Sequence, residues 1–165
     1  RLEKLGISTP KVYGDPALLL SKFYKAKTKK KYKIGIIPHF IDKNSLNLQK
    51  RLPETMKIID IQETNVQKFI DSINECENVL SSSLHGMIIA DAFRIPSARV
   101  SFSDKIVGGD FKFHDYCLSV NRRTYKAVDL SKKILDESLL KIKCELGDID
   151  QEVLLESCPF YIENI

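Results

Sequence analysis

The stretch Asn78-Val-Leu-Ser-Ser-Ser-Leu-His-Gly-Met-Ile-Ile-Ala-Asp-Ala-Phe-Arg-Ile-Pro96 decides the fold, because it predicts a buried strand, a polar turn and a helix in direct succession. Val79 and Leu80 end a short apolar strand. Apolar residues then recur at helical spacing over 84–93, and a proline stops the helix. A strand that turns directly into a helix leaves unpaired backbone N–H groups at the positive end of the helix dipole. We therefore expect an anion site at this turn, with His85 at its edge.

The composition indicates one soluble globular domain with its own core. The chain has 165 residues, of which 43% are hydrophobic and 29% are charged. Its formal net charge of +4 is small and scattered, which argues against a nucleic-acid partner. No run approaches the ~18 apolar residues that span a bilayer, and no signal peptide opens the chain.

The cysteines indicate a reducing environment. Cys76, Cys117, Cys144 and Cys158 are far apart and form no C-x-x-C pair, so neither a disulfide framework nor a zinc site is expected. We predict a cytoplasmic protein, at most in contact with the inner face of the membrane. Because the sequence opens on Arg1 rather than Met, we interpret the chain as a piece of a longer protein.

Strands and helices alternate along the chain. Apolar runs predict strands at 33–37, 56–61, 78–81 and 98–102, and helical spacing predicts helices at 17–24, 44–52, 65–75, 84–93, 110–120 and 131–145. Parallel strands need such long crossovers, so the prediction is a doubly wound α/β fold, with a mostly parallel sheet and helices on both faces. The lysine run 25–31 is interpreted as a solvated connection, and the alternative is a phosphate or membrane patch.

Ligands of such sheets bind beyond the carboxyl ends of the strands. That rule brings one set of polar residues to the same rim: His39, Glu63, Ser82, His85 and the Gly108-Gly109 loop. Lys105, Lys112 and Arg94 would supply positive charge there. Asp91 and Arg94 are interpreted as a surface pair.

Each histidine has two interpretations. His85 either contacts the anion and transfers a proton near neutral pH, or faces solvent at a helix start. His39 either binds substrate or closes the end of a strand by hydrogen bonding, and His114 is expected to pack among aromatic residues. The histidines lack ligand spacing, so no metal site is expected.

Other motifs are missing from the sequence. The serines at 81–83 lack a G-x-S-x-G frame, which favours capping and phosphate contact over acyl transfer. There is also no G-x-G-x-x-G and no P-loop, which argues against a standard dinucleotide or NTP site.

Four segments together resemble the polysaccharide pyruvyl transferase family over roughly 14–121. They are Gly14-Asp-Pro-Ala-Leu18, Ile36-Ile-Pro-His-Phe40, Ser81-Ser-Ser-Leu-His-Gly-Met-Ile-Ile-Ala-Asp-Ala-Phe93 followed by Ile95-Pro96, and Lys112-Phe-His-Asp-Tyr116. The S-S-L-H-G segment is the most specific. The resemblance implies a cytoplasmic bacterial enzyme that transfers pyruvate from phosphoenolpyruvate, as a ketal, onto a sugar of an exopolysaccharide, capsule or cell-wall unit.

The resemblance also implies a division of the protein. Such enzymes resemble two-domain GT-B glycosyltransferases, and this chain corresponds to the C-terminal, Rossmann-like half. Residues 1–12 would then end the connection from a missing N-terminal domain, 13–128 would form the Rossmann-like domain, and 129–165 a helical C-terminal segment packed on it. The partners would be phosphoenolpyruvate and a sugar or lipid-linked oligosaccharide acceptor, with no further cofactor and no metal.

By position in the family motif, His85 is the expected catalytic residue. It would bind the phosphate of phosphoenolpyruvate or protonate C3 as a sugar hydroxyl adds at C2. The remaining expected substrate-binding residues are Ser82, Ser83, Leu84, Gly86, His39, Gly108, Gly109 and Lys112. Some relatives carry an arginine where this chain has Ser83, and often a glycine where it has Arg94.

Two other functions stay open from the sequence. A GT-B glycosyltransferase using a nucleotide sugar would share the fold and the rim. A non-catalytic sugar- or partner-binding domain would not need a second domain to complete a cleft.

Overall fold

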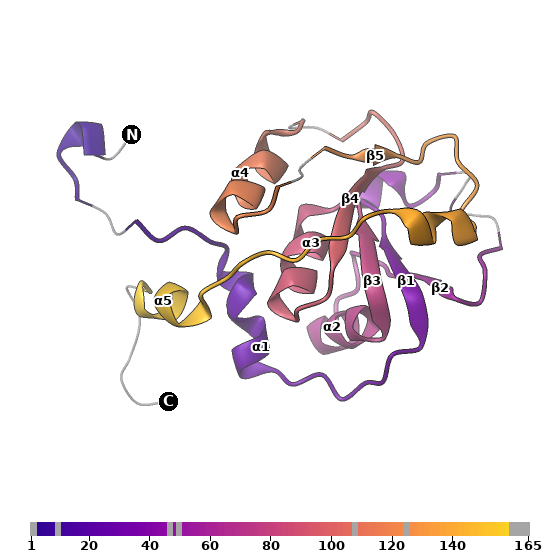
Figure 1. Cartoon of the computed structure of the whole chain (residues 1–165), viewed down its shortest axis with the longest axis horizontal. Coiled ribbons are helices and arrows are strands. Elements are labelled where there is room, and N and C mark those ends of the chain that lie inside the picture. The colour runs from indigo at the N-terminus through magenta and orange to yellow at the C-terminus, as the bar shows by residue number, and fades with distance from the viewer. Residues whose placement is uncertain are drawn as a thin grey trace.

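Five short apolar runs form one parallel sheet in the order β2-β1-β3-β4-β5 (Figure 1). The strands are β1 (Tyr32–Ile37), β2 (Met56–Ile58), β3 (Cys76–Ser81), β4 (Ser97–Ser101) and β5 (Val128–Asp129). The structure is a computed structural model that describes residues 3–8, 11–45, 48, 51–106, 109–123 and 126–158. Central pairings such as Ile36 with Leu80, and Leu80 with Ala98, fix the register. The predicted α/β class with a parallel sheet is confirmed.

Neighbouring side chains of each strand point to opposite faces of the sheet. Because apolar side chains thus lie on both faces, both faces are covered by other segments of the chain. Ile37 and Val79 face α2 (Val66–Asn74) and α3 (Leu84–Ala92). On the other face, Ile36 and Leu80 pack against Leu48 and Leu52 of the β1–β2 crossover and against the C-terminal segment. The apolar strands are therefore buried from both sides, as the sequence predicts.

The elements α4 (Phe111–Ser119) and η2 (Pro16–Leu19) form a further layer outside α3. Phe113 of α4 and Leu18 of η2 are fully buried against Met87 and Ile88. Asp15 caps η2 by accepting a 2.8 Å hydrogen bond from the Ala17 amide. η2 continues into α1 (Leu20–Phe23), as the predicted helix at 17–24 requires.

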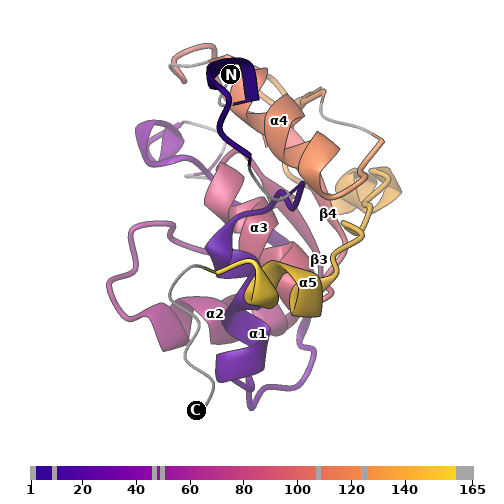
Figure 2. The ribbon, with the colours of Figure 1, turned by 90° about the vertical axis from the view of Figure 1, so that its left-hand side faces the viewer.

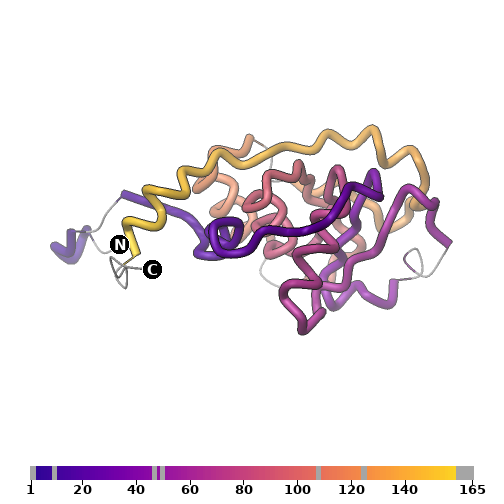
Figure 3. The backbone as a smooth tube through the Cα atoms, turned by 90° about the horizontal axis from the view of Figure 1, so that it is seen from below, coloured from indigo at the N-terminus to yellow at the C-terminus, as the bar shows by residue number. Residues whose placement is uncertain are grey.

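The first and last helical turns that the structure describes lie away from the sheet (Figure 1). A 3-10 turn, η1 (Glu3–Leu5), and the last helix, α5 (Gln151–Glu156), are found at the same end of the molecule (Figure 3). The Gln151 side chain donates to the Leu18 carbonyl, and Lys22 pairs with Glu152, so α5 is held on η2 and α1. The lysine run connects α1 to β1 without helix or strand, as predicted.

The long helix predicted at 131–145 is wrong. This segment contains only the 3-10 helix η4 (Glu137–Lys141) and otherwise runs extended across the sheet, with Leu130, Leu135 and Leu139 buried (Figure 1). The Asp129 and Asp136 carboxylates accept hydrogen bonds from amides two residues further on. Such local side-chain hydrogen bonds compete with the backbone hydrogen bonds of a helix. Burial of the three leucines against the sheet stabilises the extended conformation.

Two other sequence boundaries also shift. The second strand is shorter than predicted, ending at Ile58, although the Ile59 amide still bonds to the Ile36 carbonyl. The helix predicted at 44–52 lies partly outside the described residues. The residues of that range that the structure describes are in turns or irregular backbone, after a short 3-10 helix, η3 (Phe40–Asp42).

Candidate functional site

The strand order reverses between β1 and β3, and a crevice forms at such a point because the two following chains leave to opposite faces of the sheet. His39 follows β1 and Ser82 follows β3. The His39 amide donates a 2.7 Å hydrogen bond to Ser82 Oγ, and the Ser82 amide donates to the Ile37 carbonyl at 3.0 Å. The two loops are thus fixed to each other at the carboxyl edge of the sheet.

The turn into α3 is held from below and left open at its end. Ser81 Oγ accepts from the Ser83 amide at 3.0 Å and lies 2.7 Å from the Ser83 carbonyl, to which it donates. Ser83 occupies the N-cap position with extended backbone, but its side chain makes no capping hydrogen bond. The amides of the first turn therefore receive no acceptor from the cap residue, and the positive end of the helix dipole lies behind them.

His85, the second residue of α3, is exposed, whereas Ser82, Ser83 and Gly86 are buried. The structure thus places His85 at the open mouth of this turn. A Cβ on Gly86 would lie 2.4 Å from Ser81 Oγ and 3.1 Å from Ile37, so a glycine is needed for α3 to approach the strand ends. Sequence reasoning alone did not give this packing requirement.

Positive charge reaches the crevice from α4. Burial first, and then the Lys112 ammonium, lower the pKa of His39 below its ordinary value, while the Asp42 carboxylate opposes them. Neutral His39 is the form that caps η3, since its Nδ1 accepts from the Ile41 amide at 3.4 Å. Asp42 itself is buried and accepts from the Ser103 hydroxyl, which ties the loop after β1 to the loop after β4.

Arg99 is the rim residue that sequence reasoning missed. It lies in β4 and lines a pocket of about 240 Å³ together with Ser82, Gly109 and Asp110. Its guanidinium bonds to the Asp110 carboxylate at 2.6 Å and stacks 3.9 Å above the Phe113 ring. A single charge inside an apolar strand was the available signal, because such a strand is otherwise buried on both faces.

The other predicted rim residues are placed differently. Gly109 has φ of +54° and open space around it, while Gly108 lies outside the described residues. Glu63 is engaged by Lys68 at 2.7 Å. His114 lies on the exposed side of α4, outside the buried cluster that contains Phe113 and Tyr116.

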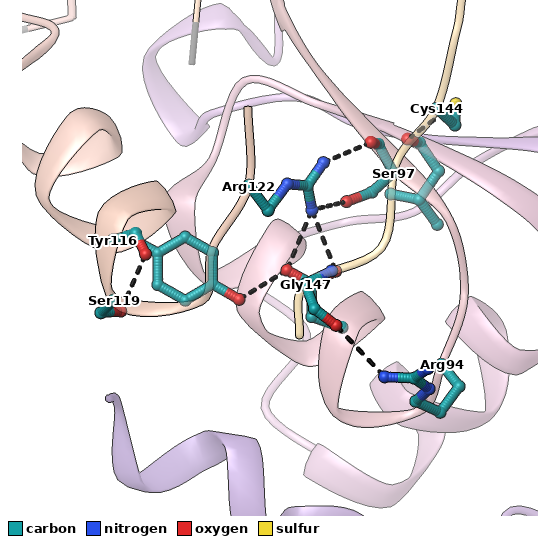
Figure 4. A network of polar contacts seen from close by, with 9 residues as sticks. Arg94, Ser97, Tyr116, Ser119, Arg122, Cys144 and Gly147 are labelled. Carbon is teal, nitrogen blue, oxygen red and sulfur yellow. Dashed lines mark hydrogen bonds and ion pairs between the residues drawn. The ribbon is translucent and has the colours of Figure 1, made fainter. Parts of the chain in front are cut away.

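The interpretation of Asp91 and Arg94 as a surface pair is also wrong. Asp91 is fully buried and accepts from Arg122 at 2.9 Å, from the Tyr116 hydroxyl at 2.6 Å and from the Gly147 amide at 2.9 Å (Figure 4). Arg94 follows the carboxyl end of α3, far from the turn at the start of this helix. Its guanidinium donates to the Gly147 carbonyl. This network joins α3, α4 and the C-terminal segment rather than contributing to the rim.

Neither disulfides nor metal clusters occur among the described residues. The four cysteines are free thiols, and burial raises the pKa of Cys76 to about 11. No group of three histidine, cysteine, aspartate or glutamate side chains within the described ranges is placed to hold a metal ion. In the same part of the chain, no helix is long and apolar enough to cross a membrane.

Comparison with known proteins identifies the family. The model of the polysaccharide pyruvyl transferase family matches residues 1–104. This chain belongs to the polysaccharide pyruvyl transferase family. The match ends before Lys112–Tyr116, so that segment of the predicted resemblance falls outside it.

Two relatives are similar to this chain over most of its length. Uncharacterized protein L143 of Acanthamoeba polyphaga mimivirus is 33% identical over 68% of this chain and 42% of its own length. Succinoglycan biosynthesis protein ExoV of Rhizobium meliloti (strain 1021) is 26% identical over 84% of this chain and 43% of its own length. The chain thus spans less than half the length of these relatives. No solved structure matches it significantly.

Proposed function

We propose that this chain binds phosphoenolpyruvate at the start of α3, as part of an enzyme that transfers pyruvate as a ketal onto a sugar. The observation that carries the proposal is the uncapped first turn of α3 at the strand-order reversal, with His85 exposed at its mouth. A helix start of this kind is a ready anion site. Family membership and the ExoV relative, named for succinoglycan biosynthesis, support a saccharide acceptor.

The amides of the first turn, Leu84 to Gly86, would hold the phosphate of the donor, while the Ser83 amide stays bonded to Ser81 Oγ. Lys112 lies close enough to His39 to act on its charge, and Arg99 lines a pocket together with Ser82. These two cations would balance the charge of the donor and take over from the arginine that some relatives carry at position 83. Binding of the donor carboxylate by Arg99 would require the guanidinium to exchange the Asp110 carboxylate for it. Ser82 and His39 would keep the two loops in register, and Gly109 would border the donor.

The chemistry has two stages. A sugar hydroxyl adds to C2 of phosphoenolpyruvate while C3 takes up a proton from His85, and the proton of that hydroxyl passes to His85 in return. A second hydroxyl of the same sugar then bonds to C2, the C2–O bond to phosphate breaks, and inorganic phosphate leaves with the second hydroxyl proton. Two carbon–oxygen bonds and one carbon–hydrogen bond form, while the C2–C3 π bond and one carbon–oxygen bond break, with no net change of oxidation state, so no redox cofactor is needed. His85 suits the proton step because an imidazole changes charge near neutral pH.

The test compares His85→Ala with His114→Ala in the gene product that carries this chain. Both histidines are exposed on α-helices, but His114 lies on α4, outside the turn. Ketal formation on a saccharide acceptor is followed by NMR of the pyruvate methyl group, together with phosphate release. We expect His85→Ala to lose about two orders of magnitude or more in rate and His114→Ala to stay near the unaltered protein.

Normal ketal formation by His85→Ala would contradict the role of this histidine. Thermal stabilisation by a nucleotide sugar, with none by phosphoenolpyruvate, would contradict the donor. Either result would leave the family membership standing, and only the second would transfer the proposal to the nucleotide-sugar class.

A further inference from the structure

A wide groove lies next to the first turn of α3, between three elements that are distant in sequence. It has a volume of about 790 Å³ and is bordered by the segment 12–16, by the first turns of α3 and by α4. Figure 2 shows the N-terminal segment passing beside α3, with α4 above it. This volume lies in the range of small-molecule sites.

The groove carries exposed aromatic rings on two of its walls. Tyr13 is 70% exposed and Phe111 is 77% exposed, and both line the groove. Large aromatic side chains are rarely left in water without a partner surface, and two at one groove offer flat apolar faces to a ligand.

Polar groups lie between the rings. The carboxylate of Asp115 and the ammonium of Lys112 both line the groove. Asp115 is exposed, and its carboxylate makes no hydrogen bond or ion pair to the side chains of the other described residues. A ligand that suits this groove therefore combines an apolar face with hydroxyl groups that donate hydrogen bonds to a carboxylate.

The groove borders the first turn of α3. Leu84 and Ile88, one helical turn apart, form its α3 wall, and His85 is the next residue after Leu84. Lys112 lines the groove and also acts on His39 in the crevice. A molecule in the groove would thus contact Leu84, the first residue of the turn that the proposed function assigns to the phosphate.

We infer that this groove binds a pyranose ring of the sugar acceptor, stacked between Tyr13 and Phe111. The hydroxyls of the ring donate hydrogen bonds to the Asp115 carboxylate. The inference rests on the proposed function, because it places an acceptor hydroxyl beside the donor held at α3. It assigns acceptor recognition to residues from the 12–16 segment and α4 that no motif of the sequence singled out for that role.

The chemistry of the groove favours a sugar over a protein segment as its occupant. A protein docked here would bury the charges of Asp115 and Lys112 together, and the cores of protein interfaces are depleted of charged residues. A pyranose supplies apolar C–H faces to the rings and donors to the carboxylate at the same time.

The experiment titrates this chain with methyl glucoside, methyl galactoside and methyl mannoside, using saturation-transfer NMR. The variants are Tyr13→Ala/Phe111→Ala and Asp115→Asn. The matched controls are Phe23→Ala, which removes a ring that is 68% exposed on α1, and Glu54→Gln, which neutralises an exposed carboxylate before β2. Because the altered side chains are exposed, circular dichroism and melting temperature should stay unchanged and verify folding.

We expect at least one of the glycosides to bind the unaltered chain. Its dissociation constant should rise about fivefold or more in each groove variant and stay unchanged in both controls. Phosphoenolpyruvate is titrated separately against all variants, and its binding should persist, which distinguishes this inference from the proposed donor site. The inference is overturned if no glycoside binds, if the controls lose as much as the groove variants, or if the groove takes up only an apolar dye. If the unaltered chain does not bind phosphoenolpyruvate, that result contradicts the proposed donor site and not the sugar site.

Discussion

Gly86 permits the approach of α3 to the sheet that brings its first turn to the rim. An added methyl group would lie 2.4 Å from Ser81 Oγ and 3.1 Å from two carbons of Ile37, all of them in the buried end of the strands. We predict that Gly86→Ala lowers the free energy of unfolding by about 2 kcal/mol. Urea denaturation measures this loss, and a variant as stable as the unaltered chain would show that the helix shifts away at no cost.

Arg94 adopts a backbone conformation that glycine adopts without strain. Its φ is +56°, at the C′ position of α3, where its amide bonds to the Asp91 carbonyl and the Ile95 amide bonds to the Ala90 carbonyl. This is the Schellman end of a helix, a position that favours glycine. Arg94→Gly relieves strain but loses the bond to the Gly147 carbonyl, whereas Arg94→Ala only loses the bond.

We therefore expect Arg94→Gly to be more stable than Arg94→Ala by about 1 kcal/mol. Thermal unfolding of the two variants at equal concentration measures the difference. Equal melting temperatures would contradict a strained left-handed arginine.

His39 links the rim to pH. Because burial and Lys112 lower its pKa below the ordinary 6.5, the unfolded chain binds this proton at higher pH than the folded chain. The contribution of His39 to stability is thus full above pH 6.5 and falls as pH drops through the lowered pKa. NMR titration of the His39 ring should show the pKa rising in Lys112→Met. Lys29→Met, in the connection before β1 at the opposite edge of the sheet, serves as the control and should leave it unchanged.

At the scale of elements, the Asp91 network fastens α4 and the C-terminal segment onto α3. Tyr116→Phe removes a 2.6 Å hydrogen bond to a buried carboxylate, which should cost about 1–3 kcal/mol. Asp91→Asn leaves the 7% exposed Arg122 without its counter-ion and should cost about 3–5 kcal/mol. Ser119→Ala, whose hydroxyl only donates to the Tyr116 carbonyl, should stay close to the unaltered chain.

Chemical denaturation of the three variants gives the order of their stabilities. If Asp91→Asn were no less stable than Ser119→Ala, the network would not hold these elements together. Activity is no substitute for this measurement, since Asp91 lies away from the turn at the start of α3.

The elements that local pattern determines were predictable, and those that depend on distant partners were not. β1 and β3 are buried on both faces, so their apolar runs were readable, and so was the turn from Leu80 to His85. The segment 131–145 has helical spacing of leucines but lies on the sheet instead, because Asx-type turns interrupt it. Asp91, Arg99 and Arg122 look like surface charges until tertiary folding supplies their partners.

At the scale of the whole molecule, strand order decides where chemistry can occur. The 2-1-3-4-5 order places His39, Ser82 and the start of α3 at one crevice, although His39 and Ser82 are 43 residues apart in sequence. The groove with Tyr13 and Phe111 opens beside that crevice. A donor and an acceptor would therefore meet along one edge of the sheet.

The central claim is that the first turn of α3 binds the phosphate of phosphoenolpyruvate. Its most direct measurement is a titration of the isotope-labelled chain with phosphoenolpyruvate, followed by amide NMR. We predict saturable shifts of the Leu84 to Gly86 amides and of His39, weaker with pyruvate, which lacks the phosphate. Shifts confined to the lysine connection at 25–31, or no saturable shifts at α3, would contradict the account.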